Sequence, residues 1–157
     1  MHKNAFTRSA VLFIAQGAYA GRAPVAPGTA GSCVGLFLFH FLRDLPGVWY
    51  GAALAGVIIA GAWAAGRAEA ILGRKDHPSI VIDEIAGLLV SLFLVPAGWG
   101  YVAAGFVLFR FFDIVKPWPI GRLQHLSGGA GVMADDLLAG VFTNAVLQVF
   151  AAFVFVR

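Results

Sequence analysis

Apolar residues are concentrated in five stretches after residue 28, and polar and charged residues gather between them. The stretches lie at about 29–42, 48–66, 85–95, 101–112 and 137–156. A weaker apolar run at 11–20 precedes them and is interrupted by Gln16 and Gly17. A helix needs about 20 residues to span the hydrocarbon core of a bilayer. The second and fifth stretches have this length, and the other three reach it only if their polar ends are also helical.

This pattern predicts an all-α protein, because lipid leaves only helices or closed barrels and no period-two strand pattern appears. We expect an integral membrane helical bundle of about four to six helices, forming a single domain over 1–157. Its helices should extend beyond the membrane on one side and carry polar residues there. The weaker run at 11–20 is interpreted as an additional helix at the surface or against the bundle, since it is too short and too interrupted for a cleavable signal peptide.

Composition supports a membrane location. Hydrophobic residues make up 60% of the chain and charged residues 12%, against about 45–50% and about 25% in soluble domains. A domain of 157 residues cannot bury that much apolar surface, so lipid must cover part of it. The net charge of +3, without aromatic residues between the basic ones, argues against nucleic acid as a partner. The lone Cys33 cannot form an internal disulfide and is interpreted as a packing residue. The sequence leaves the oligomeric state open.

The charged residues divide unequally between the two sides of the predicted membrane. If the five stretches alternate in direction, nine of the eleven basic residues fall on the side of the N-terminus, and only Arg43 and Arg157 fall on the other. The positive-inside rule makes the crowded side cytoplasmic. Seven of the eight acidic residues share that side, and only Asp44 lies opposite. The sequence therefore predicts a carboxylate-rich face at the cytoplasmic end of the bundle.

The first cluster with chemical potential is the segment 76–84, Asp-His-Pro-Ser-Ile-Val-Ile-Asp-Glu. Pro78 and Ser79 are typical of a helix start, which places Asp83 and Glu84 about one turn into the helix and directly before an apolar stretch. An acid inside a membrane helix costs roughly 2.5–3.5 kcal/mol even on the mildest scale. The pair is therefore either functional or an interfacial pair that faces water near the helix dipole.

The second cluster is the segment 110–120, at the end of the fourth stretch. Arg110 and Asp113 are three residues apart, as are Asp113 and Lys116, so each pair can share one helix face. Pro117 and Pro119 then end the helix. These residues form either part of a site or only a salt-bridged helix end.

The third cluster is the segment 128–136, in which a glycine-rich turn leads to Asp135 and Asp136. Free N–H groups at such a helix start can bind phosphate, although the glycines could equally serve a tight backbone path. The acidic pair is the stronger signal. Together, three segments bring carboxylates to one face, and oxygen ligands suit Mg²⁺ bound beside a phosphate. The sequence contains no Cys/His cluster for zinc, and we expect the isolated His77 and His125 not to be ligands.

These motifs resemble, in order and over most of the chain, those of the phosphatidylglycerophosphatase A family. The matching segments are 26–32, 76–84 with Gly87, 110–120 and 128–140. The resemblance implies a multi-pass protein of the bacterial inner membrane with its active site facing the cytoplasm. It implies Mg²⁺-dependent hydrolysis of phosphatidylglycerophosphate to phosphatidylglycerol and phosphate, in phospholipid biosynthesis. The positions that match the family's acidic motifs are Asp83, Glu84, Asp113, Asp135 and Asp136.

Among these acids we expect Glu84, Asp113 and Asp136 to bind the metal. Arg110, Lys116 and Arg22 would offset the charge of the phosphate, the main electrostatic demand of phosphoryl transfer. Arg22 lies in Ala-Gly-Arg-Ala-Pro at 20–24, where relatives usually read Ser-Gly-Leu-Ser-Pro. It is either an additional phosphate contact or a headgroup anchor, and the anchor is favoured.

Two other classes of membrane protein also carry clustered acidic residues. A CDP-alcohol phosphotransferase also uses metal and carboxylates at a membrane face, but its long Asp-Gly…Ala-Arg…Gly…Asp…Asp motif is absent. A membrane protein that moves ions would place acids at mid-bilayer, whereas here they cluster at one end. The sequence does not separate attack by water from an aspartyl-phosphate route. The number of metal ions, the general base and the headgroup selectivity stay open as well.

Overall fold

A computed structural model describes residues 2–155, and within that range it is helical and contains no strand. The elements in chain order are α1 (His2–Ala15), the 3₁₀ turn η1 (Ala20–Arg22), α2 (Pro27–Leu42), α3 (Gly47–Leu72), α4 (Ile82–Ser91), α5 (Trp99–Val115), α6 (Ile120–Leu123) and α7 (Gly128–Phe155). The predicted all-α class is confirmed. Six of these α-helices are at least ten residues long, at the upper end of the expected number, and α6 is a single turn.

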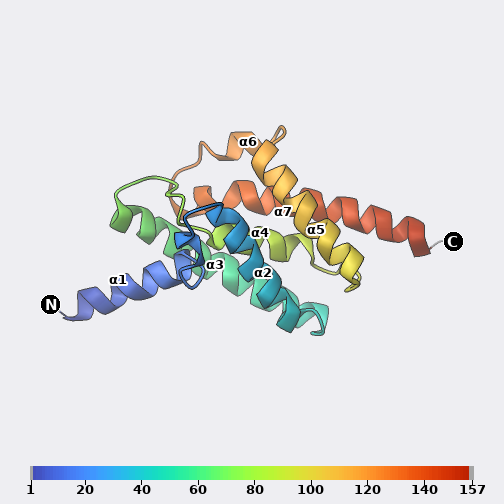
Figure 1. The fold of residues 1–157 in the computed structure, drawn as a ribbon, viewed down its shortest axis with the longest axis horizontal. Helices are drawn as coiled ribbons and strands as arrows, with labels where there is room; N and C mark the ends of the chain where they lie inside the picture. Colours follow the sequence, from blue (N-terminus) through green and yellow to red (C-terminus); the bar gives the residue numbers. More distant parts are fainter. Residues whose placement is uncertain (1, 156–157) are drawn as a thin grey trace.

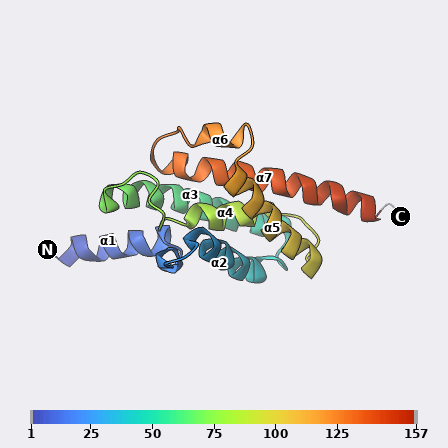
Figure 2. The same cartoon turned by 45° about the horizontal axis from the view of Figure 1, so that its top comes forward.

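The short helix α4 occupies the centre of the bundle. It packs against α2, α3, α5 and α7, and α7 also packs against α3, α5 and α6 (Figure 1). Figure 2 shows α4 between α2 on one side and α7 on the other. Followed by colour in Figure 1, the helices α2, α3, α4, α5 and α7 alternate in direction, as was assumed when the charges were divided between the two sides. The polar ends of five helices therefore meet at one end of the bundle.

Glycines let α4 and α7 approach each other closely. A Cβ on Gly87 of α4 would come 2.7 Å from the backbone carbonyl oxygen of Asp136 and would strike the ring of Phe109. A Cβ on Gly140 of α7 would strike the carbonyl oxygen of Gly87. Small residues at a helix–helix contact are the usual means of close packing in membranes. This contact places Asp136 directly beside the start of α4.

The structure corrects the predicted extent of the third stretch. It was expected to be one apolar segment over 85–95, but α4 ends at Ser91, inside the bundle. Backbone carbonyl groups at and just after this helix end accept hydrogen bonds from the side-chain amides of two residues of α7. Asn144 Nδ2 donates to the carbonyl oxygens of Ser91 (3.2 Å) and Phe93 (2.7 Å). Gln148 Nε2 donates to those of Phe93 (3.3 Å) and Leu94 (2.9 Å).

The N-terminal helix also differs from its prediction. The run at 11–20 was expected to be helical, but α1 ends at Ala15, and Gly17, Ala18 and Tyr19 have positive φ. The backbone therefore turns sharply at these three residues before η1. The Ala15 carbonyl oxygen accepts a hydrogen bond from the Val81 amide (2.9 Å), which ties this turn to the segment before α4.

Two helices, Gly47–Leu72 and Gly128–Val154, are long and apolar enough to cross a membrane by length and composition. Both extend beyond their predicted apolar stretches at the polar end of the bundle, as expected. Large apolar side chains are exposed on several helices, including Phe37, Phe41, Ile59, Trp63, Phe150 and Phe153. Exposed apolar surface of this extent indicates association with a membrane.

Candidate active site

The predicted acids come from three helices that meet at the polar end of the bundle. Asp83 and Glu84 lie in the first turn of α4, and Asp113 lies near the end of α5. Asp135 and Asp136 lie on α7, about two turns after its start. Four of the five side chains are buried, and Glu84 is intermediate.

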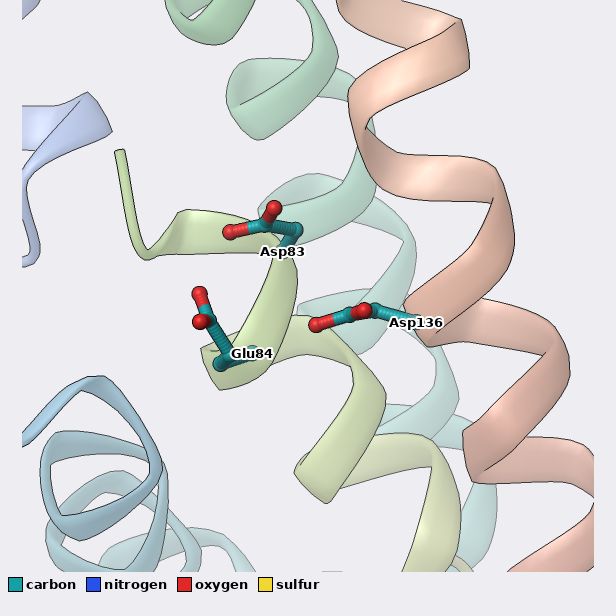
Figure 3. Close-up of side chains that lie close together, drawn as sticks. All are labelled: Asp83, Glu84 and Asp136. Atoms are coloured by element: carbon teal, nitrogen blue, oxygen red, sulfur yellow. The ribbon is translucent and has the colours of Figure 1, made fainter. Parts of the chain in front are cut away.

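Three of the acids form a compact group, which we call the acidic trio: Asp83, Glu84 and Asp136. One carboxylate oxygen of each lies within 4.8 Å of one from each of the others. In Figure 3 the side chain of Asp136 reaches from α7 toward the two acids of α4. Asp83 is 7% exposed and Asp136 only 3%. Carboxylates this close and this buried repel one another strongly unless protons or a cation compensate their charge.

Each member of the trio also has an unsatisfied oxygen. Asp83 Oδ1, Glu84 Oε2 and Asp136 Oδ2 are buried and have no hydrogen-bond partner among the described residues. A buried polar atom without a partner is costly, and in native proteins it commonly marks a functional group or a ligand position. Three such oxygens, on side chains that lie close together in space, fit a hard divalent cation, which binds oxygen ligands.

The two other predicted acids are paired with basic side chains. Arg110 Nη1 lies 2.7 Å from Asp113 Oδ2 and 3.9 Å from Glu84 Oε1. Lys116 Nζ is hydrogen-bonded to Asp135 and lies 3.6 Å from Asp113 Oδ1. The structure therefore groups Asp83, rather than Asp113, with Glu84 and Asp136. The expected ligand set of Glu84, Asp113 and Asp136 stays a prediction, since Asp113 lies beside the trio between two cations.

Lys116 links the acids of α5 and α7. It caps the C-terminal end of α5, and its Nζ is 4.0 Å from Asp136 Oδ1. Burial alone would lower the pKa of Lys116, but the hydrogen bond to Asp135 and the charges of three carboxylates raise its pKa overall. The ammonium group therefore stays protonated at the edge of the acidic trio.

Asp76 is an acid that the sequence analysis placed in a motif but not among the site residues. Its backbone N–H donates to Glu69 Oε1 of α3 at 2.7 Å. Burial raises the pKa of Asp76, and the nearby charge of Asp135 raises it further. The one feature of the sequence that could have indicated a role for Asp76 is its position directly before His77 and Pro78, in the loop that leads to α4.

The start of α2 closes one side of the site. A Cβ on Gly28 would strike Glu84 Oε1 and lie 3.0 Å from Arg110 Nη1. Gly28 therefore leaves room for the carboxylate of Glu84 and the guanidinium of Arg110 in their present positions, and a larger residue would displace them. The glycines at the start of α7 likewise serve packing, because a Cβ on Gly129 would strike the carbonyl oxygen of Ala62.

Arg22 is held in place by neutral groups. Its Nε donates to Gln16 Oε1 at 2.8 Å, and its guanidinium lies 4.1 Å from the centre of the Tyr19 ring. Gln16 Nε2 in turn donates to Ser79 Oγ at 2.8 Å, and Ser79 Oγ contacts His77 Nδ1 at 2.9 Å. Gln16 was not predicted to be functional, because in the sequence it stands out only as a polar interruption of an apolar run.

Fold and site together define a helical, membrane-associated protein with a carboxylate-rich site, flanked by two basic side chains, at one end of its bundle. The family model described as phosphatidylglycerophosphatase A matches residues 13–151, and the chain belongs to this family. No solved structure matches it.

Three curated relatives cover most of the chain. A protein of Bacteroides thetaiotaomicron, named as a candidate phosphatidylinositol-3-phosphatase, is 39% identical over 88% of this chain and 91% of its own length. Phosphatidylglycerophosphatase A of Escherichia coli is 37% identical over 85% of this chain and 79% of its own. Phosphatidylglycerophosphatase A of Haemophilus influenzae is 40% identical over 80% of this chain and 78% of its own length.

Proposed function

We propose that this chain is a Mg²⁺-dependent lipid phosphatase that hydrolyses phosphatidylglycerophosphate to phosphatidylglycerol and phosphate, in phospholipid biosynthesis. Membership of the family and the names of two relatives support this reaction. The observation that carries the proposal is the acidic trio, in which three buried oxygens have no hydrogen-bond partner among the residues that the structure describes.

The trio fits a magnesium ion because all its donors are carboxylate oxygens and because its members come from two helices that hold them close together. Glu84 and Asp136 belong both to the trio and to the ligand set predicted from the sequence. Asp83 is the third ligand that the geometry favours, and Asp113 would then orient the basic residues. When bound, Mg²⁺ polarises phosphoryl oxygens and lowers the pKa of a bound water.

The basic residues are suited to bind the phosphate. Arg110 is fixed by Asp113 at 2.7 Å, so its remaining N–H groups can donate to phosphate oxygens without a search for the right rotamer. Lys116 is fixed in the same way by Asp135. Charge that develops on the phosphate is stabilised best by donors that are already in position.

The proposal includes an orientation in the membrane. The polar end of the bundle carries the trio and, by the alternation of helices, nine of eleven basic residues, so it would face the cytoplasm of the bacterial inner membrane. The diacylglycerol part of the substrate would stay in the bilayer while its phosphate reaches the trio.

Labelling of single cysteines in a Cys33→Ser background tests this topology. An impermeant thiol reagent added to intact cells should label a cysteine at position 44 and spare one at position 77. Labelling at position 77 from outside would overturn the orientation and leave the proposed reaction untouched.

Phosphate release from phosphatidylglycerophosphate in detergent tests the activity. Release should be abolished by excess EDTA and restored by Mg²⁺; full release in EDTA would refute the metal mechanism. Phosphatidylinositol 3-phosphate serves as the second substrate, because one relative is named for it. If it is hydrolysed about tenfold faster, the headgroup in the proposal is wrong, although the reaction class stands.

A further inference from the structure

A groove between α1 and α3 lies apart from the acidic trio. It has a volume of about 420 Å³ and is lined by Thr7, Arg8, Val11, Arg67, Ala70 and Ile71. We call it the α1–α3 groove. Along α1 it lies before Ala15, whose carbonyl binds the Val81 amide next to the site. On α3 it lies beyond Gly61, which faces Ile82 and Met133. The groove is therefore farther toward the polar end of the bundle than the trio.

The groove carries two positive charges that the protein does not neutralise. Arg8 and Arg67 are exposed, and neither makes an ion pair with a carboxylate in the part of the chain that the structure describes. Two guanidinium groups on one small groove repel each other and suit a shared anion, for which the planar fork of arginine is well adapted.

Apart from Thr7, the rest of the lining is apolar. Val11 is buried and Ile71 is half-buried, and Ala70 leaves space between them and the arginines. The opposite side of α1 exposes Phe6 (78%) and Phe13 (49%), a feature of helices that lie in a membrane interface. A free inorganic anion would contact the two arginines alone, whereas a phospholipid would contact both the arginines and the apolar part of the lining.

We propose that the α1–α3 groove binds one anionic phospholipid, with its phosphodiester at Arg8 and Arg67 and an acyl chain along Ala70 and Ile71. This lipid is distinct from the substrate. It would hold α1 against α3 at the polar surface of the bilayer, where anionic headgroups are available. The proposal does not depend on the reaction catalysed at the trio.

Native mass spectrometry of the protein in detergent, titrated with dioleoylphosphatidylglycerol, tests the proposal. A basic side chain near an anionic lipid surface contributes about fivefold to affinity, so Arg8→Gln with Arg67→Gln should weaken one class of bound lipid by roughly 30-fold. Ala70→Trp keeps both charges but fills the groove, and it should weaken the same class. Phosphate release at the trio should be unchanged in all these variants.

The matched control is Arg74→Gln with Arg122→Gln, which removes two charges from the same end of the protein but not from the groove. An equal loss of lipid in this control would mean general surface electrostatics and would overturn the proposal. Equal affinity for dioleoylphosphatidylcholine would overturn the requirement for an anion. Equally tight binding of glycerophosphoglycerol would show a phosphate site rather than a lipid site.

Discussion

The polar groups at the two ends of α4 differ in whether they have hydrogen-bond partners. At its C-terminal end, the carbonyl oxygens of Ser91, Phe93 and Leu94 are bound by the neutral amides of α7. At its N-terminal end, Asp83 and Glu84 lie close to Asp136, and each of the three has a buried oxygen without a hydrogen-bond partner in the described part of the chain. Both arrangements join α4 to the same helix. The hydrogen-bonded groups at the C-terminal end hold α4 to α7, whereas the unpaired carboxylate oxygens at the N-terminal end are available to a ligand.

If the N-terminal end of α4 is the functional one, removing a charge there should harm catalysis and spare the fold. Asp136→Asn should lower turnover by at least about 100-fold, since even changes to groups that only support a metal ligand cost about 10–100-fold. Without metal its thermal stability should equal or exceed that of the wild type, because a repelling charge is gone. Phosphate-release kinetics and thermal unfolding in EDTA measure the two effects.

The control is Asp44→Asn, an exposed acid at the opposite end of the bundle. It should change neither turnover nor stability. If Asp136→Asn and Glu84→Gln both keep near-full turnover at saturating Mg²⁺, the acidic trio is not the active site.

Metal binding should stabilise the protein through the trio alone. A ligand that binds only the folded state stabilises it by about 2.7 kcal/mol at 100 times its Kd. Mg²⁺ should therefore raise the unfolding temperature of the wild type by several degrees. It should do so much less in Asp83→Asn, whereas Asn144→Leu should keep the full shift. A wild-type shift retained in Asp83→Asn would remove Asp83 from the ligands and favour Asp113 in its place.

At the C-terminal end of α4 the expected effect is smaller and structural. Asn144→Leu leaves the carbonyl of Phe93 with only Gln148 and that of Ser91 with no side-chain donor. Each unsatisfied buried group costs about 1–3 kcal/mol. Unfolding should therefore become easier, while turnover per folded molecule stays within about twofold. Loss of turnover without loss of stability would place function at both ends of α4.

Features that depend on a local run of residues could be predicted from the sequence, whereas those that depend on contacts between distant residues could not. The long apolar runs predicted α3 and α7, and three acidic segments predicted one shared site. The stop of α4 at Ser91 could not be predicted, because it depends on amides some 50 residues later. The division of the acids into a trio and two that pair with basic residues depends on such contacts as well. Spacing alone pairs Arg110 and Lys116 with Asp113, but only packing brings Asp83 to Asp136.

The smallest effect concerns Gln16, a neutral residue that connects a basic one to the site. It is 3% exposed and bonds both Arg22 and Ser79, four residues before Asp83. If Arg22 binds the headgroup phosphate of the substrate, Gln16 is a positioning residue. Gln16→Leu would free the arginine, so KM should rise by about three- to tenfold while kcat changes by less than twofold, the result expected when ground-state binding alone is lost.

The double change tests whether Gln16 acts through Arg22. If it does, Gln16→Leu with Arg22→Gln should raise KM no more than Arg22→Gln alone, because residues of one hydrogen-bonded network are not additive. A structural role would instead lower the unfolding temperature and kcat together. Additive rises in KM would show that Gln16 affects substrate binding by another route. An unchanged KM in Arg22→Gln would return Arg22 to the role of an anchor in the headgroup region.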